Sequence, residues 1–135
     1  MTDSTRKLDD FIKVVKMLRS DSGCPWDRKQ TPYSLKRYLQ EETRELLEAI
    51  DAGDPQHIKE ESGDLLYILV LLAQIHSEKN YYAMDDVIEA ISAKMVRRHP
   101  HVFQDEKTGS AAELRKKWLQ IKESEKEART KTKKN

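Results

Sequence analysis

The sequence contains few of the residues that interrupt helices or strands, and few that can cross-link the chain. Its 135 residues include four glycines, four prolines and one cysteine, Cys24. A single cysteine excludes an internal disulfide and cannot form a thiolate metal site by itself. The longest apolar run, residues 65–73, is too short to span a bilayer, and the amino terminus lacks the basic-then-apolar order of a signal peptide. We therefore expect a cytoplasmic, helix-rich protein without a membrane segment.

A strong excess of charge of either sign is also missing. Charged residues make up 36% of the chain and hydrophobic residues 37%, and the formal net charge is +1. The bases gather at the end, where residues 128–135 carry four bases and no acid. A short basic end without aromatic residues is more typical of a solubilising tail than of a nucleic-acid binder. We expect one domain over residues 1–125, followed by a basic, disordered tail over 126–135, and no nucleic-acid partner.

Apolar residues recur at helical spacing throughout the chain, and no segment alternates like a strand. Thr31 followed by Pro32 predicts the start of a helix, Gly53 predicts its end, and Ser110 begins a capping box. The expected helices cover about residues 4–19, 31–53, 54–77, 85–98 and 110–122, with a loop over 21–30. The pattern predicts an all-α fold.

The second of these helices turns two acids toward its apolar side. With Leu39 at the centre of that side and roughly 100° per residue, Glu42 lies about 60° away and Glu45 about 120° away on the same flank. Glu41 and Glu48 point to the opposite side, where a solvated helix carries its charges. The apolar stripe itself is Leu35, Leu39, Thr43, Leu46 and Ile50.

The third helix repeats this pattern. With Leu65 at the centre, Glu61 lies about 40° away and Asp64 about 100° away. Residues three apart are neighbours on a helix surface, so each helix can aim two carboxylates at one spot. If the two helices pack antiparallel across the short connection at residues 53–55, four acids converge.

Four bare carboxylates repel one another strongly. Each like-charged pair at about 5 Å costs on the order of 3 kcal/mol at an effective dielectric near 20, whereas a whole domain is stable by only about 5–15 kcal/mol. Oxygen ligands select hard cations, so we expect Mg²⁺, with Mn²⁺ as a substitute, and hence phosphate chemistry. A single inward-leaning pair of acids more often pairs with Lys or Arg, but two pairs on consecutive helices favour the metal. Glu41 is near enough in sequence to join an outer shell, and the four histidines form no recognisable ligand set.

Three cations share one face near the end of the fourth helix, namely Lys94, Arg97 and Arg98. They can interact with the helix dipole, or they can clamp phosphate groups opposite the acidic site. Trp118 and Lys122 carry the same ambiguity, since they can offer a stacking ring and a phosphate contact, although a Trp on an apolar face is more often part of a core.

The chain resembles the MazG-type nucleoside triphosphate pyrophosphohydrolases. The matching segments, in order, are CPWD at 24–27, LQEETRELLEAI at 39–50, KEESGDLLYILV at 59–70 and DDVIEAISAKMVRRHPHVF at 85–103. The family's E-E-x-x-E and E-x-x-D signature appears as Glu41, Glu42 and Glu45, then Glu61 and Asp64.

The resemblance implies a four-helix-bundle-like core with a C-terminal helix, working as a homodimer or tetramer. It implies Mg²⁺-dependent hydrolysis of an NTP or dNTP to the monophosphate and pyrophosphate by water attack at the α-phosphorus, for house-cleaning or for control of the nucleotide pool. The implied metal ligands are Glu42, Glu45, Glu61 and Asp64, and Glu41 or Glu42 would orient or deprotonate the water. The implied nucleotide contacts are Lys94, Arg98, Trp118 and Lys122.

A different class of function also fits the sequence, namely a helical regulatory module that binds nucleotide or metal without turnover. The preferred base and sugar, the number of metals and the size of the oligomer do not follow from the sequence.

Overall fold

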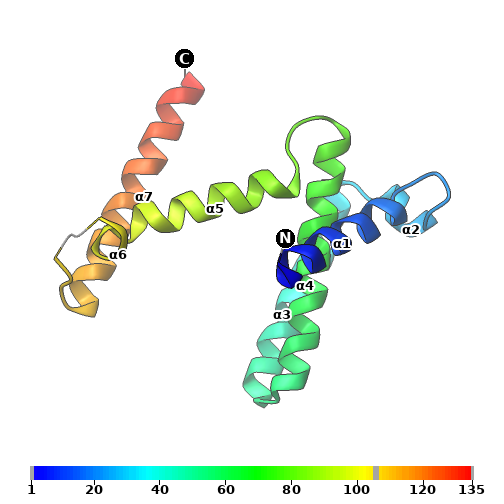
Figure 1. Ribbon diagram of the computed structural model, residues 1–135, viewed down its shortest axis with the longest axis horizontal. Coiled ribbons are helices and arrows are strands. Elements are labelled where there is room, and N and C mark those ends of the chain that lie inside the picture. The colour runs from blue at the N-terminus through cyan, green and yellow to red at the C-terminus, as the bar shows by residue number, and fades with distance from the viewer. Residues whose placement is uncertain (1, 105–106, 135) are drawn as a thin grey trace. The chain divides into compact units, whose positions relative to one another are not determined.

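A computed structural model describes residues 2–104 and 107–134, and within them the secondary structure is helical. The helices are α1 (Asp3–Leu18), α2 (Pro25–Lys29), α3 (Pro32–Ala52), α4 (Pro55–Glu78), α5 (Met84–Arg98), α6 (Pro100–Phe103) and α7 (Ala111–Lys134) (Figure 1). The all-α prediction is confirmed, and four of the five long helices begin and end within a residue or two of the predicted bounds, whereas α7 begins as predicted but continues well past residue 122. The chain divides into two compact units, one up to Val87 and the other from Ile88.

The centre of the first unit is the hairpin of α3 and α4, which lie side by side and run in opposite directions (Figure 1). Gly53 makes the turn possible because its φ of 76° is a left-handed conformation that side chains disfavour. The side chain of Asp54 accepts a hydrogen bond from the backbone N–H of Gln56 at 3.1 Å and so caps α4 at once. This tight connection fixes the antiparallel register that the acids of the two helices require.

The core of the first unit lies where α1 and α3 pack on the second half of α4. Its buried side chains are Val15, Leu35, Ile68, Val70, Leu71 and Ile75. Leu71 and Val15 are fully buried, and truncating such a leucine to alanine costs about 2–5 kcal/mol. Phe11 and Ile12 of α1 also pack against this core.

The buried faces of α3 and α4 differ from the predicted stripes. On α3, Ala49 is fully buried, whereas Ile50 is 52% exposed. On α4, Leu69 lies one turn after Leu65, the centre of the predicted inner side, yet it is 43% exposed. The prediction was wrong at these positions because a helical wheel centres a stripe on its apolar residues, whereas the packing partner decides which side is covered.

The predicted loop at residues 21–30 contains a short helix, α2, that was missed. Arg19 ties this segment to α1, because its Nη1 donates to the carbonyl oxygens of Asp27 at 2.7 Å and of Arg28 and Gln30 at 3.1 Å. Its Nη2 also pairs with the carboxylate of Glu78 at 2.6 Å. These hydrogen bonds leave no trace in apolar periodicity, and α2 is only five residues long, which explains why the pattern did not reveal it.

The second unit contains most of α5, the short α6 and α7. Pro100 ends α5 as predicted, and α6 follows it directly as a second short helix that the sequence did not reveal. The hydroxyl of Ser110 accepts a hydrogen bond from the N–H of Glu113 at 3.2 Å, which confirms Ser110 as a cap. α7 continues to Lys134 and so includes residues 126–134 of the basic segment. Among the described residues, no helix is long and apolar enough to cross a membrane.

Candidate metal centre

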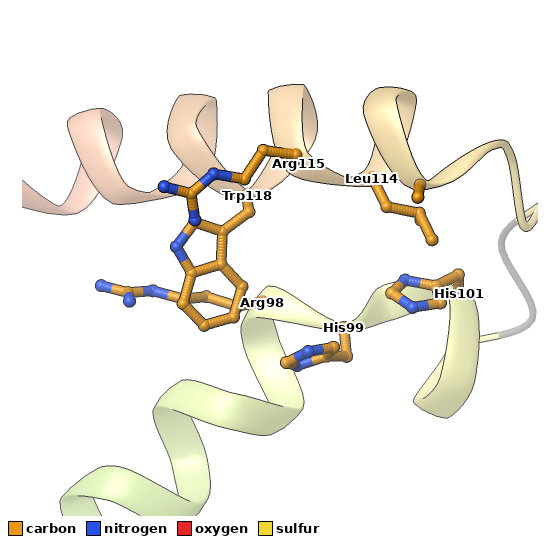
Figure 2. A pocket seen from close by; sticks show the side chains of 7 residues that line it. Arg98, His99, His101, Leu114, Arg115 and Trp118 are labelled. Carbon is orange, nitrogen blue, oxygen red and sulfur yellow. The ribbon is translucent and has the colours of Figure 1, made fainter. Parts of the chain in front are cut away.

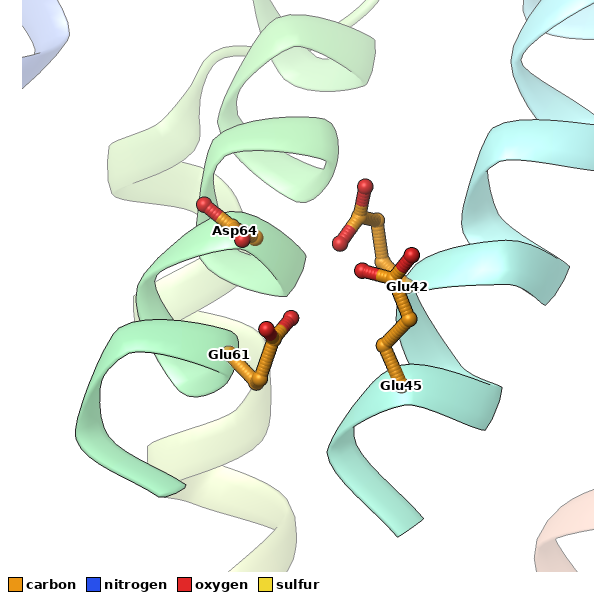
Figure 3. Close-up of side chains that lie close together, drawn as sticks. All are labelled: Glu42, Glu45, Glu61 and Asp64. Atoms are coloured by element: carbon orange, nitrogen blue, oxygen red, sulfur yellow. The ribbon is translucent and has the colours of Figure 1, made fainter. Parts of the chain in front are cut away.

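Four carboxylates from α3 and α4 converge on one point. Glu42 and Glu45 come from α3, and Glu61 and Asp64 come from α4, so that the two pairs face each other across the hairpin (Figure 3). One carboxylate oxygen from each residue lies within 4.8 Å of the others. The sequence placed these acids on the inner flanks of two helices, and the turn at Gly53 brings the flanks together.

Two oxygens in this cluster are buried and have no hydrogen-bond partner, the Oε2 atoms of Glu42 and Glu61. A buried acceptor without a donor costs about 1–3 kcal/mol, and more if it is charged. Native proteins satisfy nearly all such atoms, so an unpaired pair at one site calls for a bound group. These two oxygens are therefore positioned to accept a positively charged ligand.

The electrostatics of the cluster point the same way. Burial, together with the charges of Glu45, Asp64 and Glu61, raises the pKa of Glu42 to about 7. Burial and the nearby Glu45 and Asp64 also raise the pKa of Glu61. Without a cation, the cluster thus resists full ionisation near neutral pH. A hard divalent cation bound by oxygen ligands removes this conflict, and the donor set fits Mg²⁺ or Mn²⁺.

One neighbour of the cluster was missed by sequence reasoning. The Nε2 of His57 lies 3.3 Å from Oε1 of Glu61, one helical turn away on α4. The signal was present in the sequence, because the i, i+4 spacing places His57 and Glu61 on the same face of the helix. His57 thus orients the carboxylate of Glu61 from outside the cluster.

The remaining acids of α3 lie outside the cluster. Glu41 is exposed and does not belong to the group of converging carboxylates. Glu48 is also exposed, and its Oε1 lies 3.9 Å from Nε of Arg44. The structure thus separates Glu42 and Glu45 from their neighbours on the same helix.

The predicted nucleotide contacts all lie in the second unit, where two of them are already paired. Arg97 and Arg98 both hold the carboxylate of Glu125 on α7, a residue that the sequence analysis did not single out. The guanidinium of Arg98 also stacks on the ring of Trp118 at 4.9 Å. Lys94 is half-buried on α5, and Lys122 is exposed on α7.

A pocket of about 420 Å³ adjoins these residues. Its walls include Arg98, His99, His101, Leu114 and Trp118 (Figure 2). The pocket combines aromatic and aliphatic surface with a few polar groups, which is the usual make-up of a small-molecule site.

Comparison with known proteins agrees with the resemblance seen in the sequence. The family described as the MazG nucleotide pyrophosphohydrolase domain matches residues 30–103. An uncharacterised protein of Bacillus subtilis, YabN, is 51% identical over 116 residues, which are 86% of this chain and 24% of that protein. The nucleoside triphosphate pyrophosphohydrolase/pyrophosphatase MazG of Thermotoga maritima is 46% identical over 118 residues, which are 87% of this chain and 45% of that protein.

The fold is also found in a solved structure. The crystal structure of a mazG-related protein from Thermotoga maritima has a TM-score of 0.67 and 29% identity, and the match covers 85% of this chain and 98% of that one. YabN and the Thermotoga MazG are longer proteins, and the chain spans less than half the length of each.

Proposed function

The chain belongs to the MazG nucleotide pyrophosphohydrolase family, and from this premise we propose that it hydrolyses nucleoside triphosphates, ribo or deoxy, to the monophosphate and pyrophosphate with the help of Mg²⁺. The observation that carries the proposal is the cluster of Glu42, Glu45, Glu61 and Asp64, whose ligand atoms lie within 4.8 Å of one another. The two buried, unpartnered oxygens in the cluster support a cation as its occupant.

In the proposed reaction, water forms a bond to the α-phosphorus, and the bond from that phosphorus to the bridging oxygen breaks, so that pyrophosphate leaves. A divalent cation held by the four carboxylates would polarise phosphate oxygens, lower the pKa of water and neutralise the leaving group. Of the two acids considered for orienting the water, Glu42 lies in the cluster and Glu41 is exposed outside it. This difference favours Glu42.

The nucleotide contacts form the second half of the proposal. Lys94, Arg97 and Arg98 carry the positive charge that triphosphate oxygens require. Trp118 would offer a stacking ring and Lys122 a further phosphate contact. The close stacking of Arg98 on Trp118 supports a common role for these two residues.

Self-association as a homodimer or tetramer also belongs to the proposal. Large apolar side chains stay exposed on the hairpin, namely Leu47 at 57%, Ile50 at 52%, Leu66 at 38% and Leu69 at 43%. An apolar surface of this kind marks an interaction site. Light scattering of the purified chain measures the oligomer, and a monomer at micromolar concentration would contradict this part.

The decisive experiment incubates the full chain with Mg²⁺ and a panel of canonical and modified NTPs and dNTPs in ¹⁸O-water. Pyrophosphate plus monophosphate, with the label in the monophosphate, is the expected outcome, because water attacks the α-phosphorus. Label in the pyrophosphate, or orthophosphate plus diphosphate as products, refutes the mechanism. Nucleotide binding without any turnover supports a regulatory module in place of the enzyme.

Variants of the cluster test the assignment of residues. We expect Glu42→Gln and Asp64→Asn to abolish turnover while the helical content stays unchanged, because each removes a charged ligand. The matched control is Glu48→Gln, which changes an exposed acid on the same helix as Glu42 and is expected to keep the wild-type rate. Wild-type rates in either cluster variant contradict the assignment.

A further inference from the structure

Two arginines of α5 converge on one carboxylate of α7. The Nε of Arg97 donates to Oε2 of Glu125 at 2.8 Å, and the Nε of Arg98 donates to Oε1 at 2.9 Å. A second nitrogen of each guanidinium also contacts the same oxygen. The side chains of Arg98 and Glu125 are only 10% and 18% exposed, whereas Arg97 is 50% exposed. Side-on pairing of this kind fixes the plane of a guanidinium as well as its position.

The plane of Arg98 in turn supports Trp118. The guanidinium carbon lies 4.9 Å from the centre of the indole ring, within the range of a cation–π contact. The ring of His99 meets the indole edge-on, with centroids 5.3 Å apart and planes at 71°. The Nδ1 of His99 is itself 2.6 Å from the carbonyl oxygen of Met95. Trp118 is therefore held by two neighbours that are each anchored elsewhere.

The held indole forms a wall of the 420 Å³ pocket. In Figure 2 the guanidinium of Arg98 points away from His99 and His101, so that it supports the indole and does not reach toward those rings. His101 also lines the pocket, and its Nδ1 is buried and has no hydrogen-bond partner. A flat indole wall beside two histidine rings suits a planar heterocycle with polar edges, which is the chemistry of a nucleobase.

We propose that Glu125 is a positioning residue for this pocket: it orients Arg98, Arg98 holds the indole of Trp118, and the indole receives the nucleobase of the substrate. The inference rests on the proposed function, and it adds a residue to which no nucleotide role has been given. It also gives Arg98 a supporting role beside Trp118 in place of a phosphate contact, so that Lys94 and Lys122 remain for the phosphates. In the opposite arrangement, Glu125 merely fills a phosphate site between Arg97 and Arg98, and the two arrangements predict opposite effects of removing its charge.

The test compares Glu125→Gln with the wild-type chain, using the NTP that the wild type hydrolyses fastest and inorganic tripolyphosphate as an inhibitor without a base. We expect KM for the NTP to rise about three- to ten-fold. Without Glu125 the guanidinium of Arg98 is no longer oriented, and its cation–π contact with Trp118, worth about 1 kcal/mol, is lost. We expect kcat and the inhibition constant of tripolyphosphate to stay within about two-fold. The control is Glu127→Gln, an exposed acid two residues further along α7, for which all three values stay unchanged.

A lower KM, or tighter inhibition by tripolyphosphate, would overturn the proposal and make Glu125 a competitor of phosphate. An unchanged KM, or a parallel loss of NTP and tripolyphosphate, overturns it as well. A double-mutant cycle with Trp118→Leu adds an internal check. If Glu125 acts through the indole, Glu125→Gln has no further effect on KM in the Trp118→Leu background, and additive effects refute that route.

Failure of this inference is distinguishable from failure of the proposed function. If the wild type hydrolyses NTPs and Glu125→Gln does not change KM, only the inference fails. If the wild type hydrolyses none, the same variants are compared by calorimetric binding of ATP and of tripolyphosphate. Weaker binding of ATP with unchanged binding of tripolyphosphate then supports the positioning role of Glu125, and any other result refutes that role. Circular dichroism of each variant shows whether α7 keeps its helical content.

Discussion

Replacing Glu42 by Gln should stabilise the metal-free protein at alkaline pH. The pKa of Glu42 rises from its ordinary 4.5 to about 7, first through burial and then through the charges of Glu45, Asp64 and Glu61. The protonated form is thus the one that folding favours. Its contribution to stability is fully present below pH 4.5, is lost as pH rises through about 7, and is absent above that.

The size of the effect follows from that difference in pKa. At 1.36 kcal/mol for each pH unit, moving from 4.5 to about 7 corresponds to about 3 kcal/mol. Solvent reaches part of this side chain and screens the repulsion, so we expect about 1–2 kcal/mol. Gln carries no charge at any pH, and the variant therefore avoids this loss. The gain of Glu42→Gln over the wild type should be near zero at pH 5 and reach about 1–2 kcal/mol at pH 8.

Urea unfolding in excess chelator, followed by circular dichroism at several pH values, measures this difference. The control is Glu48→Gln on the same helix, because Glu48 is exposed and pairs only loosely with Arg44; its effect should not change with pH. Acids outside the cluster titrate equally in both proteins and cancel in the comparison. A gain that is equal at pH 5 and pH 8, or no gain at pH 8, would refute the strain attributed to the four carboxylates.

Four further outcomes are expected from the same structure. Saturating Mn²⁺ should raise the melting temperature of the wild type and leave that of Asp64→Asn nearly unchanged, because a ligand stabilises only the state that binds it; equal shifts in a thermal scan would count against the cluster as the site. Tyr67→Phe should cost about 1–3 kcal/mol in urea unfolding, since the hydroxyl of Tyr67 donates to the buried carboxylate of Asp27. Ala at Gly23 should cost about 1–3 kcal/mol, because its Cβ would lie 2.3 Å from a backbone oxygen at the end of α1. Ala at Gly63, where a Cβ meets nothing within 4 Å, should instead stabilise α4 by about 0.5–1 kcal/mol; a reversed order of these two glycine variants contradicts the packing described.

Local signals located most of the helices because they act within a few residues. Thr31 caps α3 through its hydroxyl, and Gly53 ends it in a left-handed turn, as the sequence predicted. α2 and α6 were not predicted, since each is about one turn long and too short to show a period. Their positions depend on contacts with distant residues, such as the hydrogen bond from Arg19 to the carbonyl of Asp27.

The candidate site was predictable to the extent that it is built from neighbours on single helices. The spacing of three between Glu42 and Glu45 put both on one flank, and α4 repeats that spacing in its own pair. Glu125 follows Trp118 by seven residues and Ile121 by four, so it also lies on an apolar side, a signal that was missed; only its partner Arg98, 27 residues away, could not be read from helical spacing. The side chain of Glu125 is only 18% exposed, because Arg97 and Arg98 of α5 cover it.

The sequence alone determined where the long helices begin, which acids point inward on α3 and α4, and the family that this order of motifs resembles. Helix propensity, capping and side-chain direction are local properties, so a linear pattern is enough to read them. Only the tertiary structure decided that Ala49 and not Ile50 is buried, that Glu42 has a pKa of about 7, and that Arg98 supports Trp118. These features arise from burial and from charges on other helices, and both depend on how distant segments pack.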